Sequence, residues 1–221
     1  LELDAPRDDE VLVRVVAAGI CHTDLIGSAL TPLPAVFGHE GAGVVEAVGA
    51  SVTKVRPGDH VVLTFGSCGG CASCREGAPA YCARSHALNF GGHRLAGSRT
   101  LRGPSGPVHG AFFQQSSFAS HALATERNVV PVPRDFPLEL AAPLGCGIQT
   151  GVGAVLNTLA VPAGASIAVF GAGSVGLSAI MCAVIAGCSP IIAVDVRPER
   201  LALSRELGAT PAIDARAGGT V

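Results

Sequence analysis

The fold of the chain's second half is decided by one stretch, Ile167-Ala168-Val169-Phe170-Gly171-Ala172-Gly173-Ser174-Val175-Gly176. An apolar run of strand length ends there at a G-x-G-x-x-G motif, and an apolar segment of helix length follows at Val175–Ala186. A second apolar run, Ile191–Val194, comes next and is followed by Asp195. Buried runs that alternate with a covering helix are typical of a parallel sheet. The stretch therefore predicts a doubly wound α/β domain.

The motif assigns three glycines to dinucleotide binding. Gly171 is expected to make the tight turn, Gly173 to let the backbone approach a pyrophosphate, and Gly176 to let the helix pack on the strand. The free N–H groups at the start of the helix, near Val175, would face the phosphates. A glycine-rich turn of another α/β fold stays open as an alternative, because the motif alone is weakly specific.

Asp195 predicts which dinucleotide binds. It lies 19 residues beyond Gly176, where an acid can accept hydrogen bonds from both hydroxyls of the adenosine ribose. Its charge would repel a 2′-phosphate, so the sequence favours NAD over NADP. Arg197 and Arg200 are evidence for the opposite choice, since an arginine can bind that phosphate. We expect both arginines at the surface of the next helix, with Arg200 near the ribose.

The first half of the chain has a different rhythm. Short β-rich runs separated by turns predict an antiparallel barrel-like domain over residues 1–147, with the nucleotide domain following over 148–221. The expected strands of the first domain are Val11–Val16, Gly43–Val48, His60–Thr64 and Asn128–Val132. A helix at Gly147–Leu159 is expected to bridge the two regions, and the second domain has a candidate third strand at Pro211–Ile213.

Four cysteines within fifteen residues, Cys68-x2-Cys71-x2-Cys74-x7-Cys82, predict a closed metal site. Their spacing suits one tetrahedral zinc ion, which would stabilise a loop and leave no coordination position for chemistry. An iron–sulfur cluster is the nearest alternative, but bacterial ferredoxins place the fourth ligand after three residues and follow it with proline. A disulfide framework would suit a short secreted chain, whereas this chain has 221 residues. A zinc module that binds nucleic acid would need a basic surface, whereas the net charge of this chain is −2.

Composition sets limits on the function. Hydrophobic residues make up 48% of the 221 residues and charged residues 14%, which excludes a disordered chain. A net charge of −2 gives no electrostatic reason to expect nucleic acid or an anionic membrane as a partner. No charged residue occurs from Leu140 to Val194, yet glycines and prolines divide this stretch into pieces too short for a membrane span. Eight cysteines, four of them with metal-type spacing, favour a reducing, cytoplasmic location.

A second metal site is suggested by Cys21-His22-Thr23-Asp24, Gly38-His39-Glu40 and Cys146. An isolated cysteine or histidine is more often a core residue than a ligand. Here, however, Cys146 lies at the boundary between the two regions, where a substrate can meet a cofactor. Two cysteines and one histidine with water in the fourth position form a known catalytic zinc set.

At this point the chain resembles the zinc-dependent medium-chain alcohol dehydrogenases. Gly38-His39-Glu40-x2-Gly43-x5-Gly49-x2-Val52 fits the zinc signature of that family without a gap. The cysteine cluster, Cys146 and the nucleotide motif follow in the family's order. Residues 21–24, 144–151 and Gln115-Ser116-Ser117-Phe118-Ala119 are most similar to aryl-alcohol (benzyl-alcohol) dehydrogenases. The resemblance implies a GroES-like β-barrel catalytic domain followed by a Rossmann domain.

The resemblance also implies residue roles. Cys21, His39 and Cys146 would bind the catalytic zinc, with Glu40 behind the metal and Asp24 orienting His39. Thr23 would receive the alcohol proton, and His22 would contact the cofactor pyrophosphate. The structural zinc, the second of two ions in each full-length chain, would be held by Cys68, Cys71, Cys74 and Cys82.

The implied reaction moves a hydride from an aromatic primary alcohol to NAD and leaves the aldehyde. Many relatives carry a histidine three residues after the relay hydroxyl, where this chain has Ile26. The proton would therefore leave through water or another group, of which His22 is nearest in the sequence. Substrates that stay open are aliphatic alcohols and thiol adducts of formaldehyde, and a non-catalytic, zinc-stabilised nucleotide-binding protein also stays open.

The other histidines, cysteines and phenylalanines receive weaker assignments. His60, His86, His93, His109 and His121 are expected in loops or at the surface, and Cys182 and Cys188 in the core. The candidates for walls of an aromatic-substrate pocket are Phe65, Phe90, Phe112, Phe113 and Phe118.

The family's proteins are longer at both ends, so we expect a fragment with a truncated Rossmann domain, inactive in isolation. The full-length protein would be a homo-oligomer.

Overall fold

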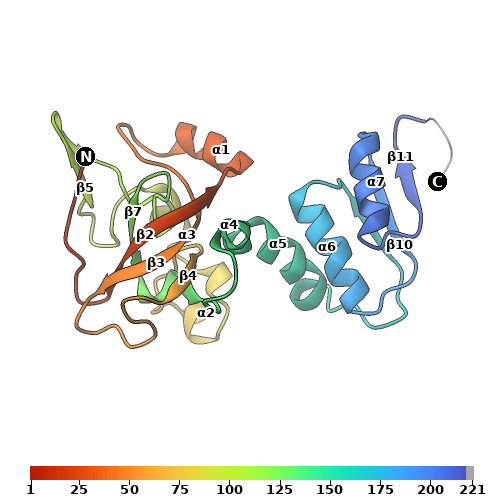
Figure 1. The fold of residues 1–221 in the computed structure, drawn as a ribbon, viewed down its shortest axis with the longest axis horizontal. Helices are drawn as coiled ribbons and strands as arrows, with labels where there is room; N and C mark the ends of the chain where they lie inside the picture. Colours follow the sequence, from red (N-terminus) through yellow and green to blue (C-terminus); the bar gives the residue numbers. More distant parts are fainter. Residues whose placement is uncertain (218–221) are drawn as a thin grey trace. The chain divides into compact units, whose positions relative to one another are not determined.

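The structure, a computed structural model, describes residues 1–217. The chain forms two compact units, one from Leu1 to Cys146 and the other beginning at Gly147. Figure 1 shows the elements of each unit along the chain. The last four residues of the expected second domain, 218–221, lie outside the described residues.

The first unit is built on a curled antiparallel sheet in the order β7-β2-β3-β4-β8. Its longest pairing joins β2 to β3, from Val11 opposite Val48 to Gly19 opposite Glu40, with two irregularities in register. Such irregularities bend a strand and increase its twist, which curls the sheet. The strands are β2 (Glu10–Gly19), β3 (Glu40–Val48), β4 (His60–Leu63), β7 (His121–Thr125) and β8 (Val129–Pro131).

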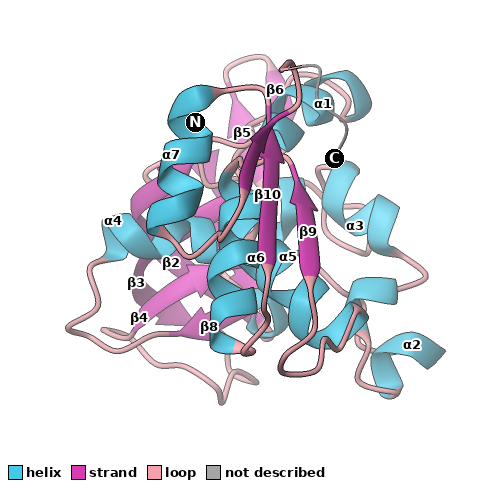
Figure 2. Ribbon diagram, turned by 90° about the vertical axis from the view of Figure 1, so that its right-hand side faces the viewer, coloured by secondary structure: helices cyan, strands magenta, loops and turns pink. Residues whose placement is uncertain are grey.

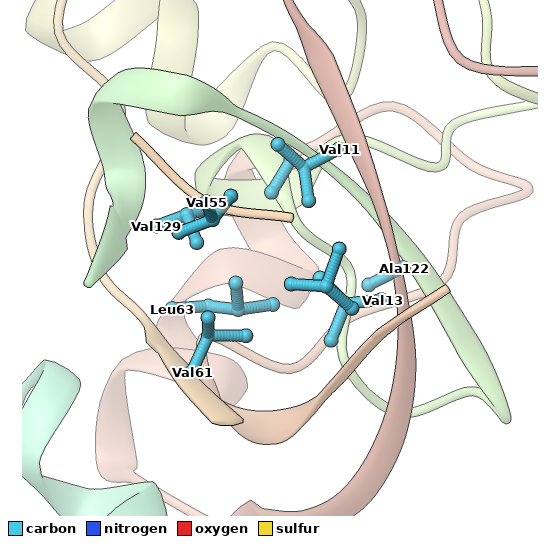
Figure 3. Close-up of a cluster of buried hydrophobic side chains, with 9 residues drawn as sticks. Val11, Val13, Val55, Val61, Leu63, Ala122 and Val129 are labelled. Atoms are coloured by element: carbon cyan, nitrogen blue, oxygen red, sulfur yellow. The ribbon is translucent and has the colours of Figure 1, made fainter. Parts of the chain in front are cut away.

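One face of this sheet forms the core of the first unit. Val11, Val13, Val61, Leu63 and Val129 are all fully buried and point toward one another from the three strands β2, β4 and β8, as Figure 3 shows. Burying a valine or leucine side chain stabilises a fold by about 1.5–3 kcal/mol. Because strand side chains alternate, this core fixes the register of β2, β3 and β4 and hence the positions of the residues at their ends.

Short elements surround the sheet. A small sheet has the order β1-β5-β6, from Glu2–Leu3, Leu101–Gly103 and Gly106–Val108. The helices are α1 (His22–Leu30), α2 (Ala72–Arg75), α3 (Ser85–Phe90) and α4 (Leu138–Ala141). The 3-10 turns are η1 (Pro79–Tyr81), η2 (Phe112–Gln114), η3 (Glu126–Asn128) and η4 (Ala142–Gly145).

The second unit contains a parallel sheet in the order β11-β10-β9. Figure 2 shows β9 and β10 running side by side, with α6 near them. Gly151 lets α5 approach α6 closely, because a Cβ there would lie 2.3 Å from the Val175 carbonyl oxygen. The elements are α5 (Gly147–Gly153), the π-helical turn η5 (Ala154–Thr158), β9 (Ile167–Phe170), α6 (Ser174–Ile185), β10 (Ile191–Asp195), α7 (Pro198–Glu206) and β11 (Ala212–Asp214).

The strand predictions are confirmed: each of the four expected in the first unit overlaps an observed strand, and β11 overlaps the candidate at Pro211–Ile213. Helix α1 was not predicted, and its burial pattern explains why. Its buried residues are Asp24 and Gly27, while Leu25 is 66% exposed, so no apolar stripe marks a core-facing side. Within residues 1–217, no helix is long and apolar enough to cross a membrane.

The expected locations of the other histidines hold in part, and the assignments of two cysteines are confirmed. His109 lies outside the named strands, as expected of a loop residue, but it is buried, and its Nδ1 lies 2.7 Å from Nη1 of Arg99. His60 is half-buried and begins strand β4 instead of lying in a loop. Cys182 and Cys188 are core residues, at 2% and 7% exposed.

Candidate metal and cofactor sites

The segment Cys21–Asp24 forms the start of α1. Cys21 is the residue at the N-terminal cap, and the Asp24 carboxylate accepts its backbone N–H at 2.9 Å through Oδ2. This arrangement satisfies one of the free N–H groups at the helix end, so the acid three residues on is what fixes the backbone of Cys21. Asp24 itself is 6% exposed.

The same carboxylate holds His39. Asp24 Oδ1 lies 2.8 Å from His39 Nδ1 and accepts the Gly38 backbone N–H at 3.2 Å. Gly38 has a φ of +94°, and a Cβ there would meet the Phe118 backbone nitrogen at 2.4 Å, so only glycine fits. One buried carboxylate thus joins the segment of Cys21 to that of His39.

Cys146 follows the 3-10 turn η4. The carbonyl of Gly145 accepts a hydrogen bond from the Thr64 hydroxyl at 3.0 Å. A Cβ at Gly145 would lie 2.0 Å from the Leu63 carbonyl oxygen, so the turn packs directly on the end of β4. These contacts bring Cys146 to the sheet edge where β3 begins.

Four potential ligands meet there: atoms of Cys21, His39, Glu40 and Cys146 all lie within 4.8 Å of one another. His39 is 1% exposed, and its Nε2 is buried without a hydrogen-bond partner. With Nδ1–H donating to Asp24, Nε2 carries a lone pair directed into the group. Two thiols, an imidazole and a carboxylate suit zinc, and the buried lone pair is what a metal would satisfy. The residues present therefore fit a zinc ion.

Glu40 owes its position to a glycine on the neighbouring strand. Gly19 is paired with Glu40 across β2 and β3, and a Cβ at Gly19 would lie 2.0 Å from Glu40 Oε2. The carboxylate therefore occupies the space that any other residue at 19 would fill.

The pKa values of the group follow from opposing effects. Burial would raise the pKa of Cys21, yet hydrogen bonds from the backbone and hydroxyl of Thr23 outweigh it and lower that pKa. Burial would lower the pKa of His39, but the Asp24 carboxylate raises it overall. Burial raises the pKa of Cys146, and the charges of Cys21 and Glu40 add to that effect. A divalent cation would favour both thiolates.

Other predicted residues lie around this group. The Thr23 hydroxyl is 3.7 Å from Cys21 Sγ. His22 is exposed at the start of α1, and Ile26, one turn later on the helix, is 47% exposed. The ring of Phe113 is tilted over the His39 imidazole at 4.6 Å. Phe112 is fully buried and packs against Gly27, which makes it a core residue rather than a pocket wall.

The four-cysteine lobe forms a second group, in which the sulfurs of Cys68, Cys71, Cys74 and Cys82 lie within 4.8 Å of one another. Two backbone N–H groups, of Cys68 and Arg84, donate to Cys82 Sγ at 3.3 and 3.4 Å. The N–H groups of Ala83 and Cys74 lower the pKa of Cys71 to about 6, while desolvation and the Cys71 thiolate raise that of Cys74 to about 11. Four converging sulfurs with no other candidate ligand nearby in the described residues suit structural zinc.

The glycine motif has the geometry of a phosphate-binding turn. Gly171 has a φ of +94°, and a Cβ at Gly176 would lie 1.8 Å from the Gly171 carbonyl oxygen. Gly173 caps α6, and the one atom a Cβ there would meet is Arg200 Nη1 at 4.0 Å. Space in front of Gly173 is what a pyrophosphate needs, and Val175, 43% exposed, lies in the first turn of α6.

Asp195 lies at the end of β10, beside this turn. Its Oδ2 accepts the Ala172 N–H at 2.7 Å, and Oδ1 accepts the N–H groups of Val196 and Arg197. These bonds lower the pKa of Asp195. Arg200 Nη1 lies 3.9 Å from Asp195 Oδ2, whereas Arg197 forms an exposed ion pair with Glu199. The structure therefore brings the glycines, Asp195 and Arg200 together.

Sequence patterns assigned no role to Gln115 or Thr64, yet both bind the backbone of ligand-bearing segments. Gln115 donates to the His39 carbonyl at 2.9 Å, and Thr64 donates to Gly145. No sequence pattern predicts these contacts, because the partners are backbone groups far away along the chain.

Comparison with protein families places both units. Residues 7–134 match the alcohol dehydrogenase GroES-like domain, and residues 174–221 match the zinc-binding dehydrogenase family. The expectation of a GroES-like domain followed by a Rossmann domain is confirmed.

Individual relatives agree with the family matches. A geraniol dehydrogenase of Castellaniella defragrans is 49% identical over 222 aligned residues, 99% of this chain and 60% of the relative. A crystal structure of an alcohol dehydrogenase zinc-binding domain protein from Burkholderia ambifaria is 61% identical with a TM-score of 0.94, over 97% of this chain and 59% of that chain.

A crystal structure of benzyl alcohol dehydrogenase from Acinetobacter calcoaceticus is 50% identical with a TM-score of 0.91, over 98% of this chain and 59% of that chain. The chain thus spans about 60% of the length of these relatives. The chain belongs to the zinc-binding, medium-chain alcohol dehydrogenase family, whose members use zinc and NAD.

Proposed function

We propose that the complete protein oxidises a primary alcohol whose carbinol carbon is bonded to an aromatic ring, with NAD as the hydride acceptor and an aldehyde as the product. The observation that carries this proposal is the buried, partnerless Nε2 of His39 among Cys21, Cys146 and Glu40. The 50% identity to a benzyl alcohol dehydrogenase supports the aromatic substrate.

A second candidate substrate is an allylic alcohol. The relative at 49% identity is a geraniol dehydrogenase. Geraniol carries a double bond next to its carbinol carbon, so the two candidates share a π-system beside the reacting centre. Half-buried Phe113 and exposed Phe118 supply apolar surface that would suit either. A non-catalytic nucleotide-binding role is disfavoured, because an unused open site would not need this complete set of donors.

Cys21, His39 and Cys146 would hold the catalytic zinc, and the four-cysteine lobe would hold a structural zinc. The catalytic ion, when bound, would supply a Lewis acid for the alcohol oxygen. Asp24 would keep His39 in the tautomer with a proton on Nδ1, so that Nε2 stays available. Glu40, in the space left by Gly19, would approach the metal during ligand exchange.

Proton transfer would begin at the Thr23 hydroxyl, the group we propose as proton acceptor. It lies beside Cys21 Sγ, on the helix turn that also carries His22. Ile26 has no titratable group, so the proton would pass from Thr23 to water or toward exposed His22. His22 would also contact the cofactor pyrophosphate.

NAD would bind at the turn of Gly171, Gly173 and Gly176, with Asp195 receiving the ribose hydroxyls. The charge of Asp195, kept by three backbone N–H groups, would repel the extra phosphate of NADP. Arg200 would lie at the same ribose. We expect a homo-oligomer in the cytoplasm, with no nucleic acid or membrane as a partner.

The test is formation of NADH by the full-length protein, followed by absorbance with benzyl, cinnamyl, geranyl and short aliphatic alcohols. We expect benzyl alcohols to give the highest kcat/KM among these four kinds of alcohol. Elemental analysis should find two zinc ions per full-length chain. Cys21→Ser should abolish turnover, whereas Cys188→Ser, a buried thiol in the nucleotide unit, should leave it. A preference for geranyl alcohol would support the second candidate, and one zinc without NADH formation would refute the enzyme.

A further inference from the structure

Gln115 is a fully buried side chain whose amide makes three hydrogen bonds. Its Oε1 accepts the Gly41 backbone N–H at 3.1 Å. Its Nε2 donates to the His39 carbonyl at 2.9 Å and to the Thr64 carbonyl at 3.2 Å. Both Nε2 hydrogens and one of the two acceptor positions of Oε1 therefore bond to the backbone of these three residues.

The amide takes the place of a missing strand residue. Strand β3 pairs with β4 from Ala42 to Val44, so this ladder has ended before Glu40. A residue of a parallel neighbour would donate to the carbonyl before Glu40 and accept from the N–H after it. Gln115 makes that same pair of bonds, to His39 and Gly41. It therefore extends the sheet across the residues that carry the ligands.

The third bond continues toward the other side of the metal site. Thr64 follows β4, and its carbonyl is held by Gln115 while its hydroxyl donates to Gly145 at 3.0 Å. Gly145 is bonded directly to Cys146. A chain of short contacts thus connects the backbone of His39, through Gln115 and Thr64, to the backbone of Cys146.

The segment that presents Gln115 is held in an unfavourable conformation. Phe113, Gln114 and Ser116 have φ values of 52°, 54° and 50°, in the left-handed region that favours glycine. The Ser116 hydroxyl donates to the Val36 carbonyl at 2.7 Å and accepts the Phe112 N–H at 2.9 Å. Such strain persists where the surroundings over-determine it, and it clusters at functional sites.

We propose that Gln115 is a positioning residue that fixes the separation of the His39 and Cys146 segments and so holds the catalytic metal. Removing its amide should keep every ligand residue in the chain but let the backbones of His39 and Cys146 move apart. The inference rests on the proposed role of Cys21, His39 and Cys146 as metal ligands, but not on the identity of the alcohol.

The chain offers a matched control in the adjacent residue. Gln114 is also buried, and its Nε2 donates to the carbonyls of Leu88 at 2.8 Å and His93 at 2.9 Å. None of these partners belongs to a ligand-bearing segment. Gln115→Met and Gln114→Met each keep the side-chain length and remove a buried amide, so both should lower the unfolding temperature.

The experiment measures metal retention in protein loaded with two cobalt ions, whose visible bands distinguish the open site from the four-cysteine site. A chelator should remove cobalt from the open site at least 10-fold faster in Gln115→Met than in the parent protein. Mutation of a residue that holds a metal ligand in place typically lowers metal affinity by about 10–100-fold. Gln114→Met should match the parent. In both variants the four-cysteine band should persist as in the parent.

Equal rates in Gln115→Met and Gln114→Met would overturn the proposal. If Gln115→Met does not fold, Gln115→Glu against Gln114→Glu repeats the comparison, because Glu keeps the acceptor toward Gly41 and loses the donor toward His39 and Thr64. Thr64→Val, which removes one link, should accelerate release less than Gln115→Met. A parent protein that oxidises no alcohol would refute the proposed function. The rates of cobalt release from Gln115→Met and Gln114→Met would still test the role of Gln115.

Discussion

Asp24→Asn is the substitution that most directly tests the geometry of the open metal site. The carboxylate accepts three hydrogen bonds, from the N–H groups of Cys21 and Gly38 and from Nδ1 of His39. Asparagine has nearly the same shape, but it replaces one oxygen by an NH2 group and removes the charge. It therefore cannot accept from all three donors.

The magnitude follows from the two orientations of the new amide. If its oxygen stays toward Gly38 and His39, the NH2 group faces the Cys21 N–H, and a buried donor without an acceptor costs about 1–3 kcal/mol. The two remaining bonds also lose their charge assistance. We expect the metal-free protein to lose about 2–4 kcal/mol of its free energy of unfolding.

In the flipped orientation the NH2 group donates to His39 Nδ1 instead. The imidazole proton then moves to Nε2, and that nitrogen can no longer bind a metal. Either orientation should weaken the affinity for the catalytic zinc, by about 10–100-fold. That range corresponds to about 1.4–2.7 kcal/mol.

The assay is a competition titration with a zinc chelator, combined with nitrogen-detected NMR of the His39 ring in the metal-free protein. Asp195→Asn is the matched control, because Asp195 is also a buried carboxylate with three backbone donors and lies in the other unit. It should cost stability without changing zinc affinity. An Asp24→Asn protein that keeps its zinc affinity within 2-fold and the parent tautomer would refute the reasoning.

Three further predictions concern the rest of the chain. Gly176→Ala should unfold the nucleotide unit, because its Cβ would lie 1.8 Å from a backbone oxygen, whereas Gly173→Ala should keep the unfolding temperature and weaken NAD binding by calorimetry. The Arg94 guanidinium, 2.8 Å from Asp4, lowers the pKa of that carboxyl below its ordinary 3.8. The Asp4–Arg94 ion pair therefore contributes stability that is fully present above pH 3.8 and is lost as the pH falls through the lower pKa of folded Asp4. In Asp4→Asn, the free energy of unfolding should depend less on pH in that range. Leu63→Ala should cost about 2–5 kcal/mol in urea unfolding, and a loss below 1 kcal/mol would contradict the core assignment.

Most of the sheet could be predicted, because alternating apolar residues report burial directly. Helix α1 could not, since its apolar residue Leu25 faces outward and its buried face consists of Asp24 and Gly27. The burial of His109 could not be predicted for a similar reason. A polar residue that is buried by long-range loop packing carries no local mark.

The sequence by itself determined the features whose partners are close along the chain. The four cysteines of the lobe lie within fifteen residues, so their spacing alone limits the geometry to one small site. The glycine motif is similar, because a Cβ at Gly176 would collide with a backbone oxygen only five residues earlier.

Only the tertiary structure decided how the open site is assembled. Cys21, His39 and Cys146 come from three distant segments, and their convergence depends on the register of β2, β3 and β4 and on the packing of η4. Gln115 and Thr64 act through backbone carbonyls, which every residue possesses. A sequence cannot mark such partners, since what selects them is position in space and not side-chain chemistry.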